Sequence, residues 1–140
     1  MIGATKIERN IDLTFSIESV KESIDRVVKA GGYALLNKND ILNTYRISKL
    51  TGLELINMNI TLKKVDEGSC SIHLEVTEQL RNSGHKMQVD KMIDAFLERL
   101  SKALTGEPDS ELEKVSKSNA GCVVTLLLLV SGVAAAYVLI

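Results

Sequence analysis

The sequence is poor in residue types that several classes of protein require. It has no tryptophan, one proline and two cysteines, Cys70 and Cys122, among 140 residues. Two cysteines make neither the disulfide framework of a small secreted domain nor the paired spacing of a zinc site. The 17 basic and 18 acidic residues give a net charge of −1. Because a large nucleic-acid footprint needs clustered basic residues, we expect no nucleic-acid partner.

Residues that could carry out catalysis are also scarce. The chain has two histidines, His73 and His85, and no nucleophile with an evident base beside it. No glycine-rich loop leads from a strand into a helix, as a phosphate site requires, because Gly31-Gly32 follows a helix instead. We therefore expect a protein that is not an enzyme and that uses no cofactor and no metal. An enzymatic role would need a cluster around His73.

Charge is missing from the last part of the chain. No Asp, Glu, Lys or Arg follows Lys117, and residues 122–140 are apolar or small throughout. At about 1.5 Å per residue, a helix of this length reaches roughly 28 Å, close to the hydrocarbon thickness of a bilayer. Residues 122–140 are therefore predicted to form one transmembrane helix in the lipid bilayer. Its small residues, Gly132 and Ala134–Ala136, would allow two such helices to pack closely.

The flanks of this segment predict its orientation. Lys114 and Lys117 precede it and no basic residue follows it, so the positive-inside tendency places the domain in the cytoplasm. Residues 1–9 contain no apolar run like that of a signal peptide, which agrees with this orientation. We expect a single-pass, tail-anchored membrane protein with a polar linker over 107–121 that has room for one helical turn.

The charged part of the chain, residues 1–106, begins with a strand and a helix. Residues 5–15 alternate between apolar and polar, which predicts a half-buried strand. Arg9 falls on the apolar side and is expected near a sheet edge. Ser16 suits the N-cap of a helix whose apolar residues recur at helical spacing, and Gly31-Gly32 suits its end.

A hairpin is predicted next. Two short apolar runs, 33–36 and 41–47, flank the polar cluster Asn37–Asp40, which predicts a turn at that cluster. Residues 49–52 are expected to interrupt the pattern.

Two longer strands and a helix complete the domain. Alternation predicts strands over 53–63 and 70–77, joined by a turn at 66–68. An apolar stripe from Val89 to Leu104 predicts the longest helix, ended by Gly106 and Pro108. The resulting order, β-α-β-β-β-β-α, predicts a two-layer α+β sandwich: a curved antiparallel sheet with both helices on one face.

Each face of this sheet supplies a candidate site. The inner face could leave an apolar cavity for a lipid or another small ligand beneath the last helix, or it could be a filled core. Its lining would be Ile11, Leu13, Ile60, Leu74, Met92, Phe96 and Leu100. The outer face is polar, nearly free of aromatic residues, and could contact a protein or only water. Its candidate contact residues are Asn57, Asn59, His73 and Glu75.

The element order also resembles known folds. The run from Ile7 to Tyr33, the cluster Asn37–Asp40, the strand 56–62 and the helix that contains Lys91–Leu97 resemble small bacterial domains of β-α-β4-α order. Their layout is similar to TBP-like and to minimal helix-grip (START/Bet v 1-like) folds. A TBP-like layout implies recognition by the sheet face, whereas a helix-grip layout implies lipid binding. The resemblance covers residues 4–104 and supplies no catalytic residue.

Two functional hypotheses follow. In the first, a non-enzymatic cytoplasmic domain binds a protein partner or forms a homo-oligomer at the membrane to which its tail tethers it. In the second, the domain binds a lipid or another small apolar ligand between the sheet and the C-terminal helix.

Overall fold

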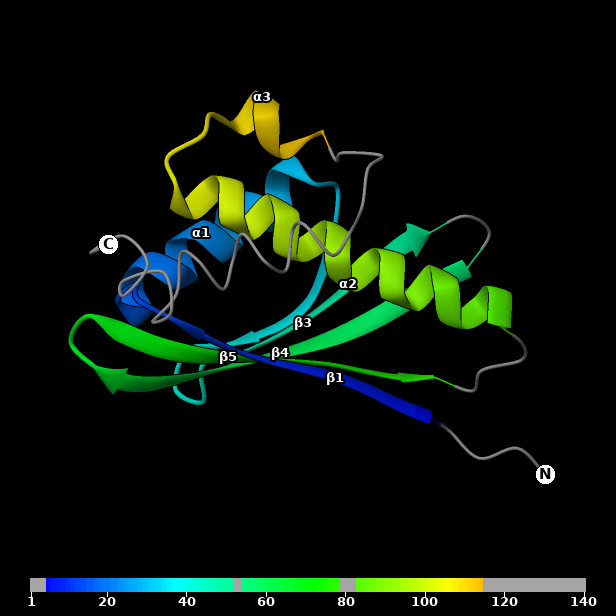
Figure 1. Cartoon of the computed structure of the whole chain (residues 1–140), viewed down its shortest axis with the longest axis horizontal. Coiled ribbons are helices and arrows are strands. Elements are labelled where there is room, and N and C mark those ends of the chain that lie inside the picture. Colours follow the sequence, from blue (N-terminus) through cyan, green and yellow to red (C-terminus); the bar gives the residue numbers. More distant parts are fainter. Residues whose placement is uncertain (1–4, 52–53, 79–82, 115–140) are drawn as a thin grey trace, which may run out of the picture.

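The computed structural model of the chain describes residues 5–51, 54–78 and 83–114. The described part contains five strands and three helices, and the helices all lie on one side of the sheet (Figure 1). The predicted α+β class and the predicted element order are confirmed. The elements are β1 (Thr5–Leu13), α1 (Ile17–Ala30), β2 (Ala34–Asn39), β3 (Thr44–Thr51), β4 (Glu54–Asp66), β5 (Ser69–Glu78), α2 (Ser83–Leu104) and α3 (Asp109–Leu112).

The sheet is antiparallel throughout, in the order β1-β5-β4-β3-β2. The first strand therefore lies at one edge and β2 at the other. Arg9 of β1 meets this expectation, because its guanidinium reaches from the edge to Asp90 of α2, with Nη2 3.5 Å from Oδ1.

The first helix begins and ends as its sequence predicts. The Ser16 side chain accepts a hydrogen bond from the backbone N–H of Ser19, which satisfies a free N–H of the first turn. At the other end Gly32 has a φ of +75°, a left-handed conformation that glycine adopts without strain. Tyr33, which directly follows, is buried, and its ring meets Phe96 of α2.

The predicted position of the turn, Asn37–Asp40, is wrong, because the turn begins only at Asp40. Residues 37–39 continue β2, and the turn occupies 40–43. The Asn39 side chain accepts hydrogen bonds from the backbone N–H groups of Ile41 and Leu42, and Asn43 takes a left-handed φ of 55°. Asparagine is favoured both as a side-chain acceptor in turns and in the left-handed conformation. Residues 37–39 of the polar cluster thus belong to the strand, and Asp40 belongs to the turn. The predicted interruption at 49–52 is also wrong up to Thr51, because β3 continues to that residue.

One apolar core fills the space between the sheet and the helices. In Figure 1 the long helix α2 runs across the sheet, with α1 beside it. The apolar inner-face residues of β1, β3, β4 and β5 and the apolar stripe of α2 belong to a single buried cluster. This packing explains why both amphipathic helices cover the same face.

Residues 107–114 fall within the predicted linker and pack against the domain. Arg26 of α1 donates to the Asp109 carboxylate (Nη2–Oδ1 2.8 Å) and to the carbonyl of Glu107 (2.7 Å). The Leu112 side chain is fully buried. Among the described residues no helix is long and apolar enough to cross a membrane. The predicted spanning segment 122–140, with its candidate packing residues, lies outside them.

Candidate functional site

The inner face of the sheet brings the predicted lining residues together. All seven are at most 5% exposed and belong to the one apolar cluster between the sheet and α2. A molecule bound among them would be completely enclosed. They are Ile11, Leu13, Ile60, Leu74, Met92, Phe96 and Leu100.

A tyrosine that the sequence did not suggest lies in this layer. Tyr45 of β3 is paired with Ile60, and Ile60 is paired with Leu74, so the phenol shares a row with two lining residues. The Tyr45 hydroxyl is buried and has no hydrogen-bond partner within the described structure. Burial raises the pKa of this phenol, and the nearby Asp25 and Asp40 carboxylates raise it further. The hydroxyl therefore stays protonated and able to donate.

Two cations, Lys49 and Arg99, lie against the ring of a second tyrosine, Tyr33, beside the same core. Tyr33 meets Phe96 edge to face, with their ring centroids 5.8 Å apart. Lys49 Nζ and Arg99 Cζ lie 5.1 and 5.5 Å from the centre of the Tyr33 ring. Arg99 donates from Nη1 to the Tyr33 hydroxyl (3.0 Å) and from Nε to the carbonyl of Leu112 (2.8 Å).

The cluster formed by Tyr33, Lys49 and Arg99 is dominated by positive charge. Lys49 donates to the carbonyl of Gly31 at 2.7 Å. Desolvation lowers the pKa of Lys49, and the charge of Arg99 lowers it further. Burial raises the pKa of the Tyr33 hydroxyl, although the adjacent Arg99 opposes this shift. The Tyr33 phenol therefore stays neutral beside the two cations.

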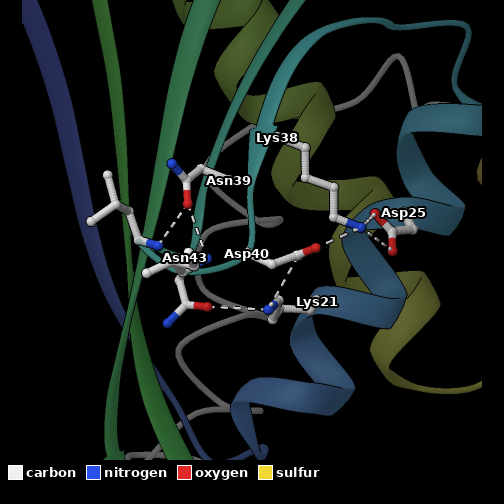
Figure 2. A network of polar contacts seen from close by, with 8 residues as sticks. Lys21, Asp25, Lys38, Asn39, Asp40 and Asn43 are labelled. Carbon is white, nitrogen blue, oxygen red and sulfur yellow. Dashed lines mark hydrogen bonds and ion pairs between the residues drawn. The ribbon is translucent and has the colours of Figure 1, made fainter.

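The hairpin of β2 and β3 is fixed to α1 by a polar network (Figure 2). Lys38 of β2 contacts the Asp25 carboxylate at 3.1 Å and also lies 5.5 Å from the Tyr45 ring centre. Lys21 of α1 bonds the Asn43 side chain at 3.1 Å and pairs with Asp40 at 3.4 Å. The turn is therefore held in a defined position over the first helix.

This fixed hairpin exposes large apolar side chains. Ile41 and Leu42 in the turn are 91% and 64% exposed. Leu35 and Leu36 on the edge strand β2 are 48% and 52% exposed, and a bulge separates their register from the rest of the strand. Since exposed apolar patches commonly mark interaction surfaces, the hairpin is a candidate contact site, although the sequence predicted only its structure and no such role.

The four predicted contact residues lie on the outer sheet face, where two of them, Asn59 and Glu75, are direct partners across neighbouring strands. Asn59 lies opposite Glu75, and Thr61 lies opposite His73, while Asn57 is further along β4. Glu75 is paired with Lys6 at 3.1 Å. The structure therefore brings these side chains onto one polar face.

His73 lies among hydrogen-bonding partners on this face rather than beside a nucleophile. Its Nε2 is 3.2 Å from a carboxylate oxygen of Glu8, and its Nδ1 contacts the side-chain oxygen of Asn10. Both partners come from β1. Within the described residues, no group of three or more His, Cys, Asp or Glu side chains could hold a metal ion.

The signals for the two tyrosine sites were present but weak. In β3, Tyr45, Ile47 and Lys49 alternate, so Lys49 occupies an inner-face position that apolar residues usually take. A lysine at such a position indicates a buried carbonyl or a charged partner nearby. Arg99 lies beside the α2 stripe, and only the three-dimensional structure shows that its guanidinium turns toward Tyr33.

Comparisons with protein-family models and with curated proteins find no match. Among solved structures, the chain is similar to that reported as the crystal structure of Ara h 8.0201, with a TM-score of 0.48 and 13% sequence identity. The match covers 79% of this chain and 98% of the other.

Proposed function

We propose that the domain is a non-enzymatic binding protein that holds a small apolar molecule between the sheet and α2. The proposal rests on the Tyr45 hydroxyl, a buried donor without a partner within the described structure, on a residue that shares a row with Ile60 and Leu74. An unsatisfied buried hydroxyl costs about 1–3 kcal/mol. A bound molecule that accepts this hydrogen bond would recover part of that cost.

The surroundings of Tyr45 define the chemistry of such a molecule. Ile60 and Leu74 continue its row across the sheet, and Met92, Phe96 and Leu100 on α2 belong to the same buried cluster. These side chains offer van der Waals contact, and the polar groups near Tyr45 itself are Lys38, Asp25 and Asp40. The proposed ligand is therefore an apolar body with at least one hydrogen-bond acceptor.

Binding can be tested on the full-length chain with 1-octanol as the probe. Native mass spectrometry of the gently purified protein should show a co-purifying small molecule or, after delipidation, a one-to-one octanol complex. Tyr45→Phe should weaken the octanol complex, because the only atom removed is the hydroxyl oxygen. Asn57→Ala, on the outer face, should bind octanol like the parent protein. A chain that retains no small molecule and forms no octanol complex would refute the proposal.

The hairpin supports a second candidate function, the binding of a protein partner or self-association at the membrane. Its four exposed apolar residues lie on an element that the Lys21 and Lys38 contacts hold in place. The predicted tail at 122–140 would raise the local concentration at a bilayer, and its small residues would permit helix packing.

Self-association is tested by sedimentation of the detergent-solubilised full chain over a range of concentrations. A dimer that disappears in an Ile41→Ser/Leu42→Ser variant supports association through the hairpin. A chain that stays monomeric at every concentration contradicts it. Deletion of residues 122–140, followed by membrane extraction, tests tethering separately.

A further inference from the structure

We infer that Lys49 and Arg99 bind the anionic group, a carboxylate or a phosphate, of an amphipathic molecule whose apolar part lies between the sheet and α2. This inference rests on the proposed function and names its ligand class.

The charge balance of the cluster of Tyr33, Lys49 and Arg99 favours a bound anion. Arg99 is only 7% exposed, yet neither Arg99 nor Lys49 forms an ion pair with any carboxylate among the residues that the structure describes. The two cations share one tyrosine ring and repel each other. Buried charges are ordinarily paired with opposite charges, because desolvation otherwise destabilises them. The cluster therefore has a net positive charge that an anion would neutralise.

The number of hydrogen-bond donors on Lys49 and Arg99 also favours an anion. A guanidinium has five N–H groups and an ammonium has three. Arg99 uses its Nε and Nη1 atoms on the Leu112 carbonyl and the Tyr33 hydroxyl, and Lys49 uses one N–H on the Gly31 carbonyl. Both side chains thus keep N–H groups for which the described structure shows no acceptor. Carboxylates and phosphates accept several such bonds at once.

The carbonyls already bound do not remove the need for an anion. Gly31 follows the C-terminus of α1, and Leu112 is the last residue of α3. Carbonyls at a helix C-terminus carry about half of a unit negative charge in total, and a four-residue helix such as α3 carries less. These partial charges explain why the cations are tolerated, and they leave net positive charge at the site.

The position of the two cations beside the apolar layer favours a ligand that is amphipathic. Phe96, a lining residue, contacts Tyr33 edge to face, so the cations border the core. On β3, Lys49 and Tyr45 lie on the same face with Ile47 between them. Four residues of strand span about 13 Å. A ligand with its anionic group at Lys49 could thus extend over Ile47 toward Tyr45. Lys49 is only partly buried, which gives the anionic group a side open to solvent.

Calorimetric titration of the full-length chain tests the inference with three soluble probes: octanoate, octyl phosphate and octanol. Octanoate or octyl phosphate should bind at least about tenfold more tightly than octanol, because each adds charge-assisted hydrogen bonds. The stronger of the two anions identifies the head group as carboxylate or phosphate. Acetate and inorganic phosphate, titrated alone, measure the anion's contribution without the apolar chain.

Variants separate this site from general electrostatics. Lys49→Met should reduce the preference for the anionic probes at least about tenfold, and should leave octanol binding unchanged. Lys49→Arg keeps the positive charge and should retain the preference for the anionic probes. This variant still tests the site if Lys49→Met does not fold. The matched control is Lys63→Met, on the exposed outer face of β4, which should behave like the parent protein.

The outcomes distinguish the two proposals. Octanol and octanoate binding with equal affinity, in the parent and in Lys49→Met alike, would overturn the anion site and leave the apolar ligand in place. An equal loss in Lys63→Met would also overturn it. Failure of all three probes to bind would refute the proposed function itself.

Discussion

Truncating Leu112 to alanine is expected to destabilise the whole domain, although this residue lies in the predicted linker. Its side chain is fully buried, and its backbone carbonyl accepts a hydrogen bond from Arg99 at 2.8 Å. Replacement of a buried leucine by alanine costs about 2–5 kcal/mol, depending on how far the site can collapse. Because α3 is short and close to the surface, it can partly collapse, so we expect a loss of about 2–3 kcal/mol.

Urea unfolding of the full-length chain, followed by far-UV circular dichroism, measures this loss. Leu36→Ala is the matched control, because Leu36 is half exposed and its truncation should change the free energy of unfolding by less than about 0.5 kcal/mol. Truncation after Gly106 should cost at least as much as Leu112→Ala, since it also removes Asp109, the partner of Arg26. A Leu112→Ala variant as stable as the parent would show that the domain ends at 106.

Three further predictions concern single side chains. Without ligand, Tyr45→Phe should raise the free energy of unfolding by about 1 kcal/mol in urea, because it removes an unsatisfied hydroxyl; a loss of stability would show that the hydroxyl has a partner. Gly31→Ala should destabilise the domain by about 1–3 kcal/mol in the same assay, because the added Cβ would lie 2.6 Å from the Tyr33 ring and 2.8 Å from the Val27 carbonyl. Burial raises the pKa of the Cys70 thiol from 9.0 to about 11. Between these two pH values the folded state holds more protons than the unfolded state, so the free energy of unfolding should fall as the pH rises. Cys70→Ala should flatten this pH profile, and an unchanged slope would contradict the assignment.

Much of the architecture could be predicted because its signals are local. Alternation identified β1, β4 and β5, and the Ser16 cap and Gly32 marked the ends of α1. The apolar stripe of α2 indicated its buried face, and all seven predicted lining residues are buried.

The hairpin shows where local patterns fail. Asn37 and Lys38 look like turn residues, yet they pair with Arg46 and Tyr45 of β3. A polar side chain on an edge strand meets little penalty, so polarity alone does not separate an edge strand from a turn. The strand order, with β2 at one edge, depends on pairings between distant segments such as β1 and β5, which local patterns do not reveal.

The tyrosine sites depend on contacts between residues far apart in the chain. Tyr33 and Arg99 are separated by 66 positions, and the guanidinium meets the phenol only after α2 has packed beside α1. Nothing in either local sequence predicts this approach. The Tyr45 hydroxyl became notable for a similar reason, since only the packed structure shows that it lacks a partner.

Carbon-13 labelling of the methionine methyl groups offers the sharpest test of ligand binding between the sheet and α2. The Met92 methyl belongs to the buried cluster under the sheet, whereas Met87, on the same helix, is exposed. On titration with octanol, the Met92 methyl signal should shift saturably and should show direct nuclear Overhauser contacts to the alkyl chain. The Met87 signal should stay unchanged. A Met92 signal that neither shifts nor contacts octanol would contradict ligand binding between the sheet and α2.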